Sequence, residues 1–218
     1  LEFQWHVAQA SDGIKKYSSG STQGPTLCTA CFAGILIRNY FVSHNGVRGQ
    51  LDKMINLLEN TPIRVVGGKA MIDRNDLKTL KNFDFSDENL YQIGVHQNLE
   101  VCCNRVKKLI YKESDPGQYV HQVFAASFSL DNYCVRTPEV LEIIYHVLAA
   151  EYKATILAAW ENSLKFPDRE GSNECILTTL GSGAFSIPPE VIARSINLCK
   201  QTIIDSGLNV RLVCFLDD

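Results

Sequence analysis

The sequence predicts an α/β fold in which a mixed, mostly parallel central sheet lies between helices. Three observations lead to this prediction. In the second half of the chain, strand-like apolar runs alternate with helical patterns. No internal repeat or low-complexity segment interrupts the alternation. The chain has 218 residues, 45% of them hydrophobic and 21% charged, which is enough to bury one core. We therefore expect a single domain over residues 1–218, with an insertion at about 44–90.

The first half of the chain predicts several short elements. The run "FQWHVAQAS" (residues 3–11) is typical of a strand, whereas "TLCTACFAGILIRNYFV" (26–42) fits either a helix or a strand. A helix is expected in "GQLDKMINLLEN" (49–60), where apolar residues recur at helical spacing. Two apolar arms around two glycines predict a hairpin at 63–72. The charged stretch 73–89 is interpreted as a solvated insertion.

The second half predicts a regular alternation of strands and helices. Strands are expected at residues 90–101, 119–130, 175–180 and 209–216, and helices at 137–164 and 188–206. The first two of these strands are expected to be buried. Pro138 falls in the first turn of the long helix, where its missing N–H costs nothing. Gly207 is expected to end the last helix.

The charge of the chain excludes some classes of partner. The formal net charge is −3, and acidic and basic residues are mixed along the sequence. A basic patch for nucleic acid or for an anionic membrane is therefore not expected. The apolar runs are too short to cross a bilayer. We expect a monomer without nucleic-acid or membrane partners.

The eight cysteines do not predict a metal site or a disulfide framework. Cys28 and Cys31 have the spacing C-x-x-C, but no second pair completes a set of four ligands. The other cysteines lie mostly singly in apolar or helical patterns. We expect buried free thiols, no metal, no cofactor and a reducing compartment such as the cytoplasm.

A glycine-rich turn follows the strand expected at 175–180. Gly181 and Gly183 allow close backbone approach, and a helix begins near Pro189. Loop and helix N–H groups together would cradle a diphosphate without Lys or Arg. The turn lacks the Gly-Lys-Ser/Thr of a triphosphatase loop and the third glycine of a dinucleotide fingerprint. The alternative is a turn with a purely structural role.

The segments "ILTTLGSGAFSIPPEVIARSI" and "VRLVCFLDD" resemble the end of macro domains. The resemblance covers Tyr119 to the C-terminus and implies a three-layer α/β/α fold that binds ADP-ribose. It implies that the loop around the ligand diphosphate consists of Gly181, Ser182, Gly183, Ala184, Phe185 and Ser186. Ser186 stands where the family usually has glycine.

The segment "STQGPTLCTACFAGILIRNYFV" is similar to one in macro-domain ADP-ribosyl hydrolases of the MavL-type branch. This resemblance implies a first ligand loop that includes Thr22, Gln23 and Gly24. It also implies hydrolysis of ADP-ribose from a modified protein, with ADP-ribosylated ubiquitin as a candidate substrate. A relative of such effectors would act in a host cytosol. The alternative is a cytosolic housekeeping enzyme.

Hydrolysis at the ribose needs a carboxylate that activates water or stabilises the oxocarbenium-like transition state. The candidates are Asp12, Glu100 and Asp131, each of which could equally be a solvated or capping residue. Asp131 is preferred because it follows an expected buried strand. The segment 18–21 has none of the acids that relatives carry there, which favours a second function, a reader that binds ADP-ribose without cleaving it. A third hypothesis is a cysteine hydrolase that uses Cys28 or Cys31.

Overall fold

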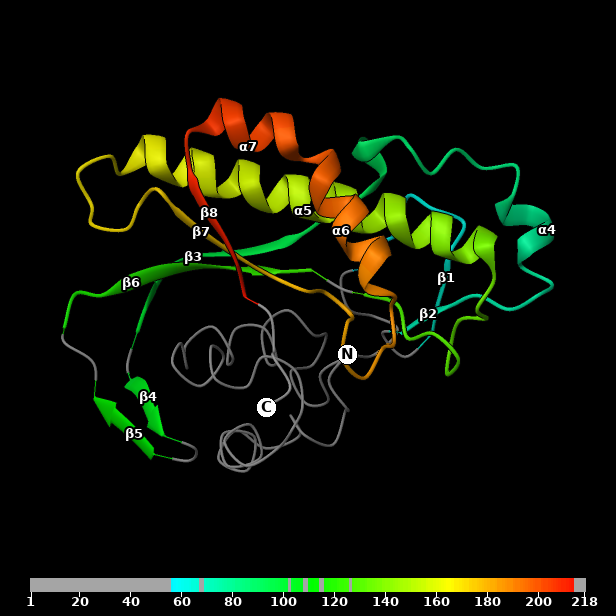
Figure 1. Cartoon of the computed structure of the whole chain (residues 1–218), viewed down its shortest axis with the longest axis horizontal. Coiled ribbons are helices and arrows are strands. Elements are labelled where there is room, and N and C mark those ends of the chain that lie inside the picture. Colours follow the sequence, from blue (N-terminus) through cyan, green and yellow to red (C-terminus); the bar gives the residue numbers. More distant parts are fainter. Residues whose placement is uncertain are drawn as a thin grey trace. The chain divides into compact units, whose positions relative to one another are not determined.

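The computed structural model describes residues 56–66, 69–101, 103–107, 110–113, 116–125 and 127–213. Two compact units divide the chain, and each is described by itself. The first includes Val95–Gln122, and the second comprises Leu57–Val65, Lys69–Gly94 and Val123–Asp218. Figure 1 shows the elements of both units in sequence colours.

The described residues contain both strands and helices. The strands are β1 (Arg64–Val66), β2 (Lys69–Met71), β3 (Gly94–Glu100), β4 (Cys103–Lys107), β5 (Ile110–Glu113), β6 (Tyr119–Phe124), β7 (Glu174–Thr178) and β8 (Asn209–Val213). The helices are α4 (Leu77–Leu80), the 3-10 helix η3 (Glu88–Leu90), α5 (Pro138–Lys165), α6 (Pro189–Leu198) and α7 (Lys200–Ser206).

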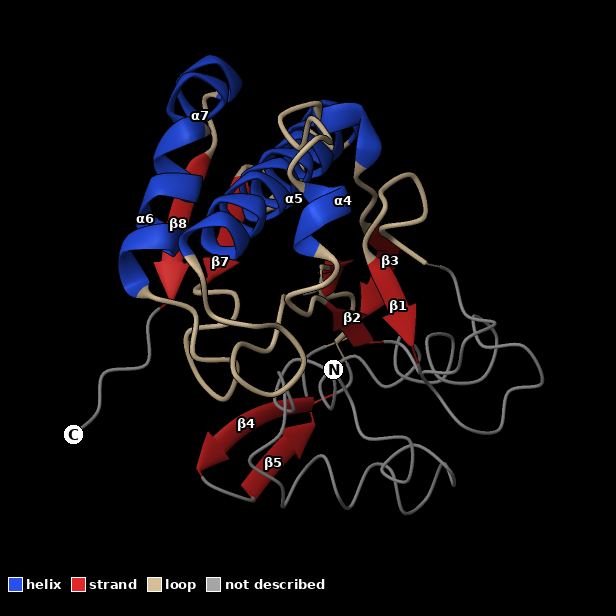
Figure 2. Ribbon diagram, turned by 90° about the vertical axis from the view of Figure 1, so that its right-hand side faces the viewer, coloured by secondary structure: helices blue, strands red, loops and turns tan. Residues whose placement is uncertain are grey.

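The described strands pair two by two, as β1-β2, β3-β6, β4-β5 and β7-β8. The β1-β2 pair brackets Gly67 and Gly68, as the hairpin prediction requires. The β7-β8 pair is parallel, with Glu174 beside Asn209 and Thr178 beside Val213. Because α6 and α7 lie between these strands in sequence, this part of the chain is a β-α-β unit (Figure 2). The α/β class is confirmed.

Helix α5 is the longest element and forms the centre of the second unit. The hydroxyl of its N-cap residue, Thr137, accepts a hydrogen bond from the Val140 N–H at 3.3 Å, and Pro138 occupies the first turn. The helix contacts α6, α7, β7 and η3. Its buried face includes Ile144 and Leu148, both fully inaccessible to solvent. The predicted helix is therefore confirmed, and it provides the surface on which the β-α-β unit packs.

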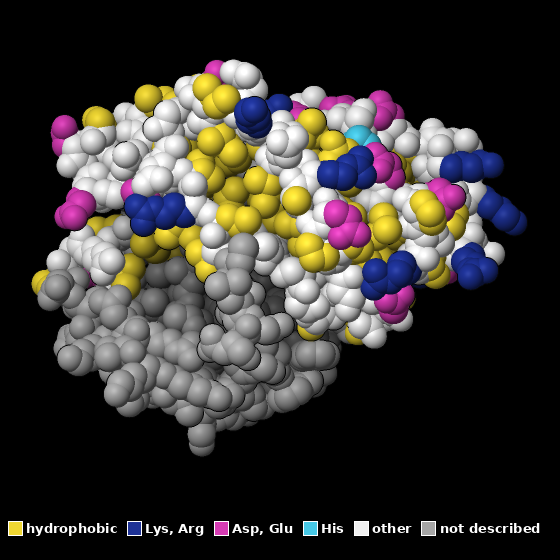
Figure 3. Space-filling view, viewed as in Figure 1, with side chains coloured by type: hydrophobic (Ala, Val, Ile, Leu, Met, Phe, Trp, Pro, Cys, Tyr) yellow, Lys and Arg dark blue, Asp and Glu magenta, His cyan; other side chains and the backbone are white. Residues whose placement is uncertain are grey.

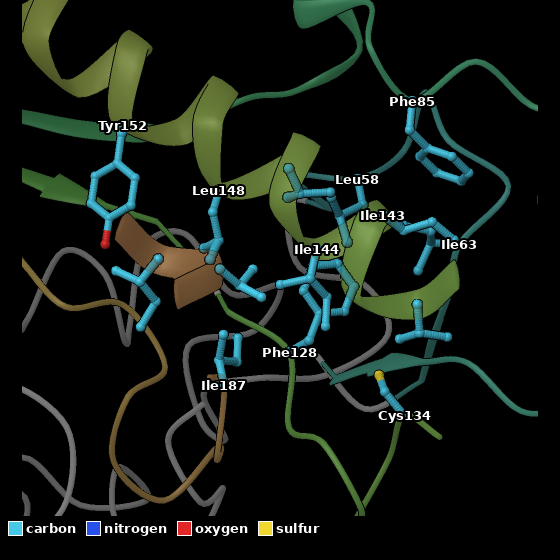
Figure 4. Packing of buried hydrophobic residues seen from close by; sticks show 14 of the residues in the cluster. Leu58, Ile63, Phe85, Phe128, Cys134, Ile143, Ile144, Leu148, Tyr152 and Ile187 are labelled. Atoms are coloured by element: carbon cyan, nitrogen blue, oxygen red, sulfur yellow. The ribbon is translucent and has the colours of Figure 1, made fainter. Parts of the chain in front are cut away.

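The hydrophobic core of the second unit lies between α5 and the segments around it (Figure 4). Phe128 and Ile187 approach it from the loops that follow β6 and β7. The predicted insertion is wrong as a purely solvated segment, because its Leu80 and Phe85 are 2% and 6% exposed and belong to this core. These two apolar residues stand among the many charged residues of 73–89, which is why the sequence predicted a solvated segment.

Several elements differ from the sequence prediction in extent, burial or continuity. The strand expected at 119–130 ends at Phe124, and residues 127–129 continue outside any strand. Strand β3 is not buried: its residues are mostly exposed or half-buried, and Leu99 alone on it is buried. The helix expected at 188–206 is two helices that meet at Cys199, whose φ of −82° and ψ of 0° are not helical. Gly207, with φ of 64°, ends α7 as expected.

Part of the surface of the second unit remains apolar. Ile176 on β7 and Leu212 on β8 are 64% and 46% exposed. Hydrophobic side chains also gather over the middle of the face shown in Figure 3. Within the described residues, none of the helices combines the length and the apolar character that crossing a bilayer requires.

Candidate functional site

The glycine-rich turn forms the loop between β7 and α6, residues 179–188. The buried side chain of Tyr152, on α5, holds its first residues. The Tyr152 hydroxyl donates to the Thr178 carbonyl at 2.8 Å and accepts from the Leu180 N–H at 2.9 Å. In Figure 4 this hydroxyl points from the helix toward the loop. The start of the loop is therefore attached to the core.

Backbone hydrogen bonds then fold the loop into consecutive turns. The Ser182 N–H donates to the Thr179 carbonyl at 3.1 Å. The Ser186 N–H donates to the Gly183 carbonyl at 2.9 Å, and the Ile187 N–H to the Gly181 carbonyl at 3.0 Å. Ile187 is buried in the core, so both ends of the loop are anchored.

The middle of the loop presents backbone donors that the turns do not use. The N–H groups of Gly183, Ala184 and Phe185 have no acceptor within the described part of the chain. Gly183 and Ala184 are exposed, and a Cβ placed on Gly183 would meet nothing within 4 Å. Successive N–H groups in a turn form a concavity that suits an anion. These three groups, called the N–H row below, are the part of the loop best suited to bind an anion.

The N-terminus of α6 contributes less than the sequence suggested. Pro188 is its N-cap residue and Pro189 opens its first turn, so neither has an N–H to offer. The N–H of Val191 already donates to the Pro188 carbonyl at 3.0 Å. Glu190 adds a negative charge to the first turn. The expectation of several unpaired N–H groups at this helix end is wrong, and anion binding would depend on the loop itself.

Gly181 allows the loop to pass very close to the neighbouring segment. Its φ is 82°, and a Cβ there would lie 2.4 Å from Ser127 Oγ and 2.7 Å from Ile187 Cδ1. Ser127 is 7% exposed, and its hydroxyl has no hydrogen-bond partner among the described residues. Only glycine fits this position without displacing its neighbours.

Asp131 lies beside the loop but is already paired. Arg136 Nη2 donates to Asp131 Oδ2 at 2.7 Å and Arg136 Nε donates to the same oxygen at 2.9 Å. The same Nη2 donates to the Ser186 carbonyl at 3.1 Å, and the Leu130 N–H donates to the Phe185 carbonyl at 3.0 Å. The hydrogen bond to Asp131 raises the pKa of Arg136. Arg136 therefore connects Asp131 to the loop.

Sequence reasoning missed Arg136. Its signal was a basic residue directly before the Thr137 cap of the long helix, in the same loop as Asp131. Among the other candidates, Glu100 ends β3 in the first unit and is exposed. Asp12, Cys28 and Cys31 lie outside the described residues, and so do Thr22, Gln23 and Gly24.

The described residues hold no group of three or more His, Cys, Asp or Glu side chains that could bind a metal ion. The three described cysteines with placed side chains are free and buried, as expected: Cys134, Cys175 and Cys199. Burial raises the pKa of each thiol to about 11. They are poor nucleophiles, because the thiolate is the reactive form.

Comparison with known proteins adds no relative to this picture. No protein-family model, curated protein or solved structure matches the chain.

We expect Gly181→Ala to lower the free energy of unfolding by about 2–3 kcal/mol, because strain from the positive φ adds to overlap with Ser127 and Ile187. Gly171→Ala is the matched control, since Gly171 has φ of 73° but no atom within 4 Å of its Cβ position. Its cost should be about 1 kcal/mol. Urea unfolding measures both. Equal losses would contradict the close approach at residue 181.

The buried thiols predict a loss of stability at high pH. Their pKa rises from 9.0 to about 11 on folding, so their contribution is complete below pH 9 and disappears as the pH approaches 11. Each thiol should account for about 2 kcal/mol of that loss. Unfolding free energies of the wild type and of Cys175→Ala, measured from pH 8 to 11, test this. Parallel curves would show that the Cys175 thiol does not contribute.

Proposed function

We propose that the chain is an ADP-ribose-binding macro domain that removes ADP-ribose from an ADP-ribosylated protein. The proposed fold is the three-layer α/β/α arrangement with a mixed central sheet, of which β7 and β8 would form a parallel part. The choice of ADP-ribose as the ligand comes from the sequence resemblance to macro domains. The row of N–H groups at Gly183, Ala184 and Phe185, which have no acceptor among the described residues, is the observation that carries the proposal.

The position of this row fits the proposed ligand. The loop follows the carboxyl end of β7, which pairs in parallel with β8, and ligands of open α/β sheets bind beyond the carboxyl ends of parallel strands. Its donors are neutral, and Arg136 is the one cation hydrogen-bonded to the loop within the described residues. A diphosphate has several oxygens that can accept hydrogen bonds from such donors. Because both ends of the loop are anchored, its binding would require little ordering.

Calorimetric titration with ADP-ribose tests the proposal. We expect micromolar binding of ADP-ribose and much weaker binding of AMP and ribose 5-phosphate, which lack the diphosphate. Gly183→Glu should weaken binding by about 2 kcal/mol or more, about 30-fold, because a carboxylate would enter the N–H concavity. Its unfolding curve should change little, since a Cβ on Gly183 meets no atom within 4 Å.

Asn173→Glu is the matched control for this variant. Asn173 is exposed and directly precedes β7, so the substitution adds the same charge at the opposite end of the strand. It should leave affinity for ADP-ribose unchanged. If Gly183→Glu also binds ADP-ribose as tightly as the wild type, residues 179–188 are only a structural turn.

The ion pair of Asp131 favours the reader as a second candidate function. Two donors of the Arg136 guanidinium engage Asp131 Oδ2, so this oxygen is not free to accept a proton from a water molecule. The hydrolase would have to release Asp131 from Arg136 when substrate binds, or use Asp12 or Glu100 instead. A reader needs neither.

Asp131→Asn separates the two functions. Asparagine keeps the size of the side chain and tolerates the left-handed backbone of this position, where φ is 65°. If Asp131 is the catalytic carboxylate, release of ADP-ribose from a modified protein should fall at least about 100-fold while affinity changes little. Asp168→Asn, in the exposed loop after α5, is the control and should release ADP-ribose at the wild-type rate. Undiminished release by Asp131→Asn would assign catalysis elsewhere, and no release by the wild type would identify a reader.

A further inference from the structure

Arg136 connects two loops that are far apart in sequence. Its guanidinium donates twice to Asp131 Oδ2, at 2.9 and 2.7 Å, and once to the Ser186 carbonyl, at 3.1 Å. The side chain of Arg136 is 38% exposed and that of Asp131 59% exposed. The contact with Ser186 is made to the backbone, so it acts on the course of the loop itself.

Both residues held by Arg136 have a left-handed backbone. The φ of Asp131 is 65° and that of Ser186 is 56°, and among the described non-glycine residues only Asn98 shares this property. Such residues are strained and persist where surrounding contacts hold them. Asp tolerates the conformation better than Ser does, because left-handed backbone is enriched in Asp and Asn. Ser186 therefore has the greater need of an external contact.

The conformation of Ser186 determines how the N–H row is presented. Its N–H donates to the Gly183 carbonyl at 2.9 Å, which closes the turn that carries Gly183, Ala184 and Phe185. The next N–H, that of Ile187, donates to the Gly181 carbonyl at 3.0 Å. If Ser186 relaxed to a negative φ, both bonds would be disturbed and the row would lose its shape.

We propose that Arg136 is a positioning residue that holds the loop after β7 in its observed conformation through the Ser186 carbonyl, and so replaces the glycine that the conformation would otherwise require. Glycine adopts a positive φ without strain and would need no such contact. Serine needs such a contact, and the guanidinium of Arg136 provides it by donating to the Ser186 carbonyl. Asp131 in turn holds the guanidinium by accepting from it. The effect on ligand affinity rests on the proposed function, whereas the effect on the loop does not.

The test compares Arg136→Gln in two backgrounds, with Ser186 and with Ser186→Gly. Hydrogen exchange of the Ser186 and Ile187 amides reports the loop, and amides in the centre of α5 serve as the internal reference. With Ser186 present, Arg136→Gln should speed loop exchange at least about tenfold relative to the reference. It should weaken ADP-ribose binding by a similar factor, because the loop then adopts the conformation that presents the N–H row for a smaller fraction of the time.

In the Ser186→Gly background the same substitution should have little effect. Exchange and affinity of the double variant should lie within about threefold of those of Ser186→Gly alone, since glycine holds the turn without the arginine. Equal losses in both backgrounds would overturn the proposal and would instead indicate that Arg136 contacts the ligand directly. Unchanged loop exchange in Arg136→Gln would also overturn it.

Two further variants separate positioning from charge. Arg136→Lys keeps the positive charge but has a single ammonium in place of the planar fork, so it should resemble Arg136→Gln. Wild-type behaviour of Arg136→Lys would overturn the proposal. Arg194→Gln removes an exposed charge that pairs with Glu142 on α5, and it should leave loop exchange and affinity unchanged. If the wild type binds no ADP-ribose, the proposed function fails, but hydrogen exchange still decides the role of Arg136.

Discussion

The hydroxyl of Tyr152 joins the longest helix to the end of β7, and the geometry of the candidate site depends on that contact. It donates to the Thr178 carbonyl and accepts from the Leu180 N–H, so one buried group satisfies two backbone atoms where the strand stops. Tyr152 is 2% exposed, and its ring packs in the core. The loop therefore begins at a fixed point, and Ile187 returns it to the same core.

Between these anchors the site relies on backbone dipoles more than on charge. The N–H groups of Gly183, Ala184 and Phe185, without acceptors among the described residues, are neutral donors, and Arg136 donates both to Asp131 and to the Ser186 carbonyl. Such a site can accept an anion in a chain whose net charge is −3. The prolines at the start of α6 remove donors that a helix end usually supplies. Recognition would thus be concentrated in one short loop.

The ion pair with Arg136 changes the role that can be assigned to Asp131, the catalytic candidate preferred from the sequence. A carboxylate beside an anion-binding loop would repel the ligand if it stood alone. With Arg136 donating to it twice, the pair is neutral as a whole and also holds the backbone at Ser186. The same hydrogen bonds occupy Oδ2, the oxygen that both donors of Arg136 contact. The proposed hydrolase would therefore have to release a side chain that the folded loop uses.

The sequence by itself determined the local features whose causes are local. Thr137 and Pro138 predicted the start of α5, Gly207 the end of α7, and two apolar runs around a helical pattern the parallel pair β7-β8. It also predicted free, buried thiols. Helical spacing and capping depend on residues a few positions apart, so they can be recognised along the chain.

Tertiary structure decided what depends on distant partners. Three features follow from packing that no local pattern encodes. Leu80 and Phe85 belong to the core, β3 is largely exposed, and the helix breaks at Cys199. The bond from Arg136 to Ser186 spans fifty positions in sequence, and it forms because α5 and the β7-α6 loop are anchored to the same core. From sequence alone, a charged residue such as Arg136 is expected to be solvated. Only the folded structure shows which acceptor it contacts.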